Sequence, residues 1–131
     1  MAKGDNTSYP KEKIKILFLE NISDVAVGNF RRHGYVQVEK ISRALTEEQL
    51  IEEIKDVHIL GIRSKTLITN KILEAAKKLQ AIGCFCIGVN QVDLKAATRN
   101  GVVVFNAPYS NTRSVAELVI GAYIMPVSYT H

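Results

Sequence analysis

Tryptophan is absent from this chain of 131 residues, and the chain contains only two cysteines and three prolines. The cysteines, Cys84 and Cys86, lie two positions apart, so on a strand they share one face and are poorly placed to bond to each other. This excludes a disulfide-stabilised scaffold. The pair could form a Cys-x-Cys half-site for a metal ion. We favour the simpler interpretation, that both thiols pack as apolar side chains in a reducing cell.

Long hydrophobic runs and a strong net charge are also missing. No apolar run approaches the roughly 20 residues that a transmembrane helix needs, and the polar residues 1–15 do not resemble a signal peptide. The sequence therefore predicts a cytoplasmic protein that does not bind membranes. A net charge of +4 is too mild for a dedicated nucleic-acid binder and suits a protein that handles small anions.

Short apolar runs alternate with amphipathic stretches along the chain. The runs predict five strands, and Ser23, Thr69 and Asp93 are well placed to cap helices between them. Capping boxes are expected at residues 46–49 and 114–117. This alternation predicts an α/β fold, a flavodoxin-like parallel five-stranded sheet with helices on both faces. The predicted strands are residues 14–19, 35–38, 57–62, 81–87 and 102–105.

The two ends of the chain differ from its middle. Residues 1–13 are predicted to be a disordered leader, and residues 14–121 to form one compact segment. Pro126 would break the last helix, and residues 126–131 can be back-translated into a sequence that resembles a transposon-end adapter. We therefore expect 122–131 to be a truncated helix with an artefactual tail, the alternative being an ordinary polar C-terminus.

Three loops follow strands and should meet at the carboxyl edge of the sheet, where open α/β sheets bind ligands. The first carries Arg63, whose guanidinium fork suits a carboxylate or phosphate, and Ser64, whose hydroxyl and following amides could donate. In the second, Gly88 lets a ligand approach the main chain, and in the third Asn111 can donate or accept. Each loop alone has an ordinary explanation as a solvated turn, but together they predict an anion-binding site.

Several kinds of catalytic or cofactor motif are missing. No Gly-x-Gly-x-x-Gly follows a strand, so no dinucleotide site is visible. No set of Ser, Cys, His and Asp suggests a catalytic triad, and neither His33 nor His58 is expected to act in catalysis. Asp93 is better explained as a helix cap than as a functional acid.

Three stretches resemble the phosphoglycerate-oxidising members of the D-2-hydroxyacid dehydrogenase family. They are LGIRSKT at 60–66, AIGCFCIGVNQVD at 81–93 and FNAPYSNTRSVAEL at 105–118, and the match extends over roughly 13–121. The resemblance implies a two-domain enzyme that uses NAD to oxidise 3-phosphoglycerate to 3-phosphohydroxypyruvate, the first step of serine synthesis. It also implies that this chain holds part of the substrate-binding domain, that the Rossmann NAD domain is absent from it, and that the parent enzyme is a homo-oligomer.

The same resemblance assigns roles to particular residues. It implies that Arg63 and Ser64 meet the substrate, that the amides of Ile87 and Gly88 face its carboxylate, and that Asn111 lines the pocket. The catalytic Arg, Glu and His of the family would lie beyond residue 131, so the fragment alone is expected to be inactive. Two alternatives stay open: another D-2-hydroxyacid dehydrogenase, and a non-enzymatic flavodoxin-like interaction domain.

Overall fold

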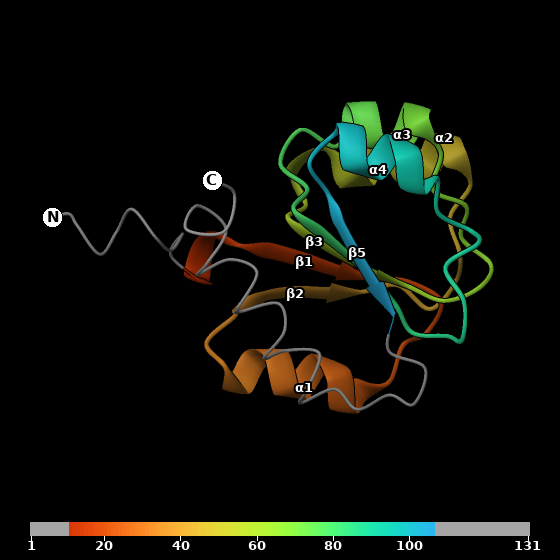
Figure 1. Cartoon of the computed structure of the whole chain (residues 1–131). Coiled ribbons are helices and arrows are strands. Elements are labelled where there is room, and N and C mark those ends of the chain that lie inside the picture. The colour runs from red at the N-terminus through yellow and green to blue at the C-terminus, as the bar shows by residue number, and fades with distance from the viewer. Residues whose placement is uncertain (1–10, 107–131) are drawn as a thin grey trace, which may run out of the picture.

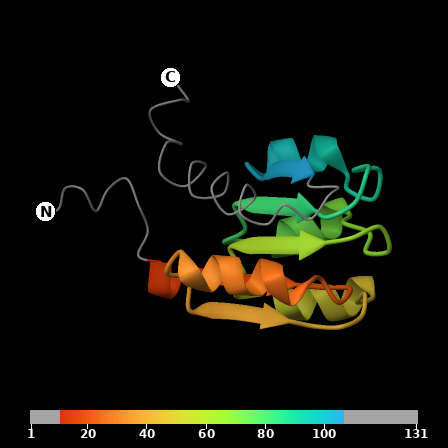
Figure 2. The same ribbon diagram turned by 90° about the horizontal axis from the view of Figure 1, so that it is seen from below.

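A single five-stranded sheet forms the centre of the molecule. The computed structural model describes residues 11–106. Each strand runs parallel to its neighbours, and the order across the sheet is β2-β1-β3-β4-β5. Figure 2 shows the strand arrows pointing the same way. The α/β, flavodoxin-like sheet predicted from the sequence is confirmed. The strands are β1 Lys15–Phe18, β2 Gln37–Lys40, β3 Ile59–Ile62, β4 Ala81–Cys84 and β5 Val103–Asn106.

Helices cover both faces of the sheet, as predicted. One face carries α1 (Asp24–Arg32), and the other carries α2 (Glu47–Glu53), α3 (Asn70–Ala75) and α4 (Leu94–Arg99) (Figure 1). A short 3-10 helix, η3 (Ile54–Asp56), follows α2. Within residues 11–106, none of these helices has the length and apolar character that crossing a bilayer requires.

Side chains cap the four α-helices at the positions expected from the sequence. Ser23 accepts from the Val25 N–H, and Thr69 and Asp93 cap α3 and α4. Thr46 forms a complete capping box with Gln49, because each side chain accepts from the other residue's backbone N–H. Caps of this kind contribute about 1 kcal/mol each. They fix where α2, α3 and α4, each only six or seven residues long, begin after the loops at the sheet edge.

The strand bounds in the structure differ from the predicted ones, most clearly for the second and fourth strands. The second was expected at residues 35–38 but lies at Gln37–Lys40. Tyr35 is instead buried in the core, where its ring meets Phe30 edge-on and its N–H donates to the Phe30 carbonyl. The fourth ends at Cys84, short of the predicted residue 87, and Ile87 is 85% exposed. The chain therefore leaves the sheet before the loop that carries Gly88.

The end of the predicted leader also has defined structure. Residues 11–13 form a 3-10 helix, η2 (Lys11–Lys13), where a leader without structure was expected. Lys11 Nζ donates to the His33 carbonyl at 2.7 Å and lies 5.6 Å from the centre of the Tyr35 ring. These contacts attach the segment before β1 to the end of α1.

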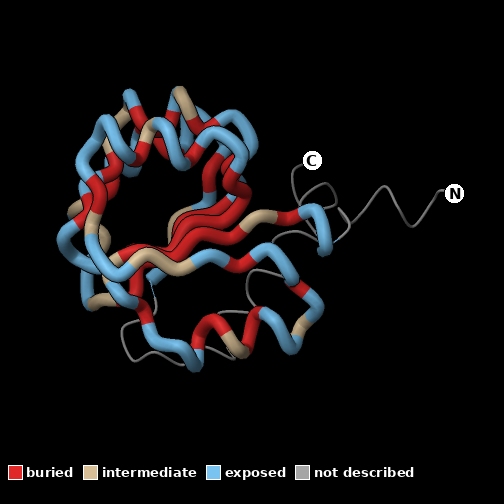
Figure 3. The backbone as a smooth tube through the Cα atoms, turned by 180° about the vertical axis from the view of Figure 1, so that it is seen from behind, coloured by how far each residue is buried: buried red, intermediate tan, exposed pale blue. Residues whose placement is uncertain are grey.

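Apolar side chains form one core on each side of the sheet. Figure 3 shows the central strands as a continuous buried band. The larger core lies between the sheet and α2, α3 and α4 and includes Leu17, Leu60, Ile82 and Cys84, while Cys86 packs against it. The smaller core lies under α1 and includes Phe18 and Phe30. The two cysteines thus face the same core, although β4 ends at Cys84 and Cys86 lies in the loop that follows.

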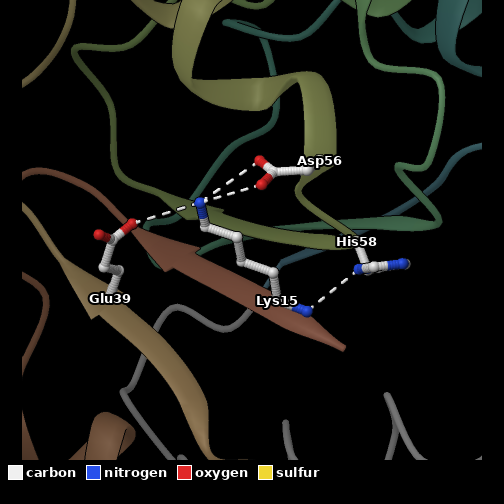
Figure 4. Close-up of polar contacts among 4 residues, drawn as sticks. All are labelled: Lys15, Glu39, Asp56 and His58. Carbon is white, nitrogen blue, oxygen red and sulfur yellow. Dashed lines mark hydrogen bonds and ion pairs between the residues drawn. The ribbon is translucent and has the colours of Figure 1, made fainter. Parts of the chain in front are cut away.

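His58 joins the start of β3 to β1 (Figure 4). Its Nδ1 accepts from the Lys15 backbone N–H at 3.0 Å, and the Lys15 Nζ pairs with Asp56 and Glu39. Burial lowers the pKa of His58 below 6.5, the nearby Lys78 lowers it further, and Asp56 partly opposes them. The lowered pKa and the accepting Nδ1 both favour the neutral imidazole in the folded protein.

We expect the free energy of unfolding to fall as pH drops below about 6.5. The unfolded chain then binds a proton on His58 more readily than the folded chain does, so the stabilisation present above the unfolded pKa is lost. His58→Asn keeps an acceptor near the Nδ1 position and removes this titration. Urea unfolding at about pH 7.5 and about pH 5.5 should show a smaller decrease for His58→Asn, and an equal decrease would contradict the prediction.

Candidate functional site

The loops after β3 and β4 lie side by side at the carboxyl edge of the sheet. They line a cavity of about 680 Å³, which contains four of the five residues proposed from the sequence: Arg63, Ser64, Ile87 and Gly88. The fifth, Asn111, lies outside the described residues. The other lining residues are Leu67, Phe85, Cys86, Asn90 and Gln91.

A carboxylate that was not predicted holds the first loop. The Oε2 atom of Glu20 accepts from the Arg63 N–H at 2.8 Å, the Thr66 N–H at 3.1 Å and the Thr66 hydroxyl at 2.7 Å. Its Oε1 atom accepts from the Lys65 N–H at 3.0 Å. The expectation that amides following Ser64 serve the ligand is therefore wrong for Lys65 and Thr66, since an internal anion already occupies them.

Gln91 ties the first loop to the second. The side-chain Nε2 of Gln91 donates to the Arg63 carbonyl at 2.8 Å. The backbone carbonyl of Gln91 accepts from the Ile68 N–H at 2.8 Å. The chain continues this link, because the Asp93 N–H donates to the Ile68 carbonyl and Ile68 pairs with Val92 as a short parallel bridge. The Arg63 loop and the Gly88 loop are thus parts of one hydrogen-bonded unit.

The second loop turns its carbonyls toward protein donors. Asn106 Nδ2 donates to the Ile87 carbonyl at 2.8 Å, and Cys86 Sγ donates to the Gly88 carbonyl at 3.1 Å. A Cβ atom placed on Gly88 would meet only the Asn90 side chain, at 3.9 Å. The backbone at Gly88 is therefore open to the cavity, and a ligand can approach it closely.

The structure does not favour Cys84 as a nucleophile at neutral pH. Burial, together with the neighbouring Cys86 and Glu20, raises the pKa of Cys84 to about 12. Both thiols are free. Among residues 11–106, no group of three or more His, Cys, Asp and Glu side chains could hold a metal ion. The Arg63 guanidinium and the Ser64 hydroxyl, which line the cavity, are hydrogen-bond donors of the kind that suits an anion.

Of the two residues that were missed from the sequence, Glu20 could have been found by the rule that located the others. Glu20 follows β1, a central strand, and so lies at the same edge as Arg63. Its signal was a charged residue directly after an apolar run. Gln91 carried no comparable signal, because its role depends on the approach of two loops that are distant in the sequence.

A family model and several relatives match the chain. The model for the catalytic domain of D-isomer specific 2-hydroxyacid dehydrogenases matches residues 16–131. The D-3-phosphoglycerate dehydrogenase of Dictyostelium discoideum is 61% identical over 114 residues, 87% of this chain and 28% of that protein. The enzyme of the same name from Escherichia coli (strain K12) is 53% identical over 125 residues, 95% of this chain and 30% of that protein. The chain thus spans less than a third of the length of these relatives.

A solved structure agrees with these matches. The crystal structure of the NAD⁺-bound 3-phosphoglycerate dehydrogenase of Entamoeba histolytica is similar with a TM-score of 0.62 and 28% identity, covering 86% of this chain and 39% of that one. The parallel sheet and the residues matched by the family model lead to the same assignment. The chain belongs to the D-isomer-specific 2-hydroxyacid dehydrogenase family.

Proposed function

We propose that this chain supplies the substrate-anion site of an NAD-dependent enzyme that oxidises 3-phospho-D-glycerate to 3-phosphohydroxypyruvate, the first step of L-serine biosynthesis. The observation that carries the proposal is the meeting of Arg63, Ser64 and the Gly88 loop around one cavity. The identity to proteins named D-3-phosphoglycerate dehydrogenase supports this choice of substrate over other D-2-hydroxyacids.

Within this proposal, the described residues orient the substrate. Arg63 supplies a planar pair of donors for a carboxylate or phosphate, and the exposed backbone at Ile87 and Gly88 supplies uncharged donors to the same anion. Because Gln91 links the two loops, their donors keep a fixed spacing. Such positioning contributes to rate by reducing the freedom of the bound substrate.

The described residues do not fit the nicotinamide cofactor. A dinucleotide site needs a glycine-rich turn between a strand and a helix, and no two of the eight glycines of the chain are separated by a single residue. We therefore assign NAD, which would accept the hydride, to a Rossmann domain outside this chain. In this division, residues 14–121 belong to the substrate-binding domain, and the prediction made for 122–131 lies outside the described residues.

The wider setting follows from the same proposal. We place the enzyme in the cytoplasm, in agreement with the free thiols of Cys84 and Cys86, since free cysteines are usual in a reducing compartment. A homo-oligomeric parent enzyme stays a prediction. This segment alone is expected to be inactive, because the residues that the family uses for proton and hydride transfer are assigned beyond it.

The test is NADH formation by the full-length enzyme with 3-phosphoglycerate and with unphosphorylated D-2-hydroxyacids. We expect kcat/KM for 3-phosphoglycerate to be larger by about 100-fold, the size of two charge-assisted contacts to a phosphate. A preference for an unphosphorylated acid would favour the alternative of another D-2-hydroxyacid dehydrogenase. The absence of turnover with every acid would favour a non-enzymatic domain.

A further inference from the structure

We propose that Glu20 is a positioning residue for the substrate site and acts through Arg63. The inference rests on the proposed function, because it concerns how the same cavity is organised. Glu20 lies outside the set of residues that line the cavity. Its effect on the substrate is therefore indirect: it sets the path of the loop that carries Arg63 and Ser64.

The contacts of Glu20 account for the shape of that loop. Four donors from three residues, Arg63, Lys65 and Thr66, converge on its two carboxylate oxygens at 2.7–3.1 Å. The two oxygens of a carboxylate both accept, whereas a neutral amide has a single accepting oxygen. The backbone of residues 63–66 thus curves around the carboxylate, and the N–H groups of Arg63, Lys65 and Thr66 point at its oxygens.

The Glu20 side chain is itself held in place by its backbone. Glu20 and Asn21 have φ values of 62° and 56°, in the left-handed region that few non-glycine residues adopt. The Glu20 N–H donates to the Arg43 carbonyl at 3.1 Å, and the Asn21 N–H donates to the Ile41 carbonyl at 3.3 Å. Such backbone conformations persist where the surroundings enforce them, and here they direct the carboxylate at the Arg63 loop.

The negative charge of Glu20 is evidence that this residue serves the substrate site. A carboxylate beside an anion-binding cavity repels the ligand, so its presence weakens binding unless it organises stronger donors. Because Glu20 occupies the amides of Lys65 and Thr66, the donors left for the anion are the Arg63 side chain, the Ser64 hydroxyl and the Gly88 loop. Glu20 therefore determines which donors the substrate meets.

The experiment compares Glu20→Ala, Glu20→Gln and Arg63→Ala in the full-length enzyme. We expect Glu20→Ala to raise the KM for 3-phosphoglycerate about tenfold, with kcat within about twofold and the KM for NAD unchanged. Glu20→Gln keeps one accepting oxygen and should have a smaller effect. The double variant Glu20→Ala/Arg63→Ala should raise the KM by less than the product of the two single effects, because residues that act through one another are not additive.

A matched control is Glu39→Ala, which removes an exposed glutamate on β2 whose contact is with Lys15. This variant should leave the KM for 3-phosphoglycerate and the KM for NAD unchanged.

An unchanged KM for 3-phosphoglycerate in folded Glu20→Ala would overturn the inference, as would full additivity with Arg63→Ala. If Glu20→Ala does not fold, Thr66→Val removes one donor to the carboxylate, and a KM rise of about threefold supports the inference while no rise overturns it. If Arg63→Ala leaves the KM for 3-phosphoglycerate unchanged, that result would overturn the proposed substrate site and this inference with it.

Discussion

Arg63→Ala in the full-length enzyme should raise the KM for 3-phosphoglycerate about 10- to 100-fold. A hydrogen bond to a charged group contributes about 1.5–3 kcal/mol, and about 1.4 kcal/mol corresponds to a factor of ten in affinity. Arg63 lines the cavity beside Gly88, and its main chain is held on both sides, by Glu20 at the N–H and by Gln91 at the carbonyl. The substitution therefore removes the guanidinium while these backbone contacts remain possible.

The KM for NAD should not change, because we assign the cofactor to the Rossmann domain. Arg63→Lys should have an intermediate effect, since an ammonium keeps the charge and loses the two-pronged geometry. Arg99→Ala serves as the matched control: Arg99 is an exposed arginine at the end of α4 whose guanidinium contacts Asn70, and its loss should leave KM unchanged. Steady-state kinetics of the three variants checks the prediction, and a wild-type KM for Arg63→Ala would remove Arg63 from the site.

Local rules were enough to predict most of the fold. Apolar runs located the five strands, and the side chains of Ser23, Thr46, Thr69 and Asp93 accept at the predicted helix starts. Helix caps act over three residues, so the signal and its effect lie close together in the sequence. Parallel pairing then follows from the alternation of strands and helices, because each crossover returns the chain to the same edge.

The errors arise where tertiary contacts outweigh the local pattern. Tyr35 looks like a strand residue, but packing against Phe30 places it in the core before β2 begins. The amides of Lys65 and Thr66 look like ligand donors until Glu20, more than 40 positions away, is seen to occupy them. The proposed anion site was predicted from the strand ends alone, whereas the contacts that shape it join residues from three different loops.

The second large effect is expected on stability, from Gly61→Ala in β3. Gly61 faces the smaller core, and an added Cβ would lie 2.3 Å from Phe18 Cδ1 and 3.2 Å from Phe85 Cε1. Phe18 has little room to move, because its ring is buried between edge-on contacts with Phe30 at 5.5 Å and Phe85 at 5.8 Å. Forcing extra volume into a packed core costs about 1–3 kcal/mol, and we expect the upper end of this range.

Urea unfolding should therefore show a clearly lower midpoint for Gly61→Ala. Gly28→Ala is the matched control: its Cβ would lie 3.6 Å from Arg32 Nη1, an ordinary contact, and alanine inside α1 should stabilise the helix by about 0.5–1 kcal/mol. A wild-type midpoint for Gly61→Ala would show that Phe18 can move after all. If the clash with Phe18 is the cause, Phe18→Leu should cost less in the Gly61→Ala background than in the wild type, because the smaller side chain makes room for the new methyl group.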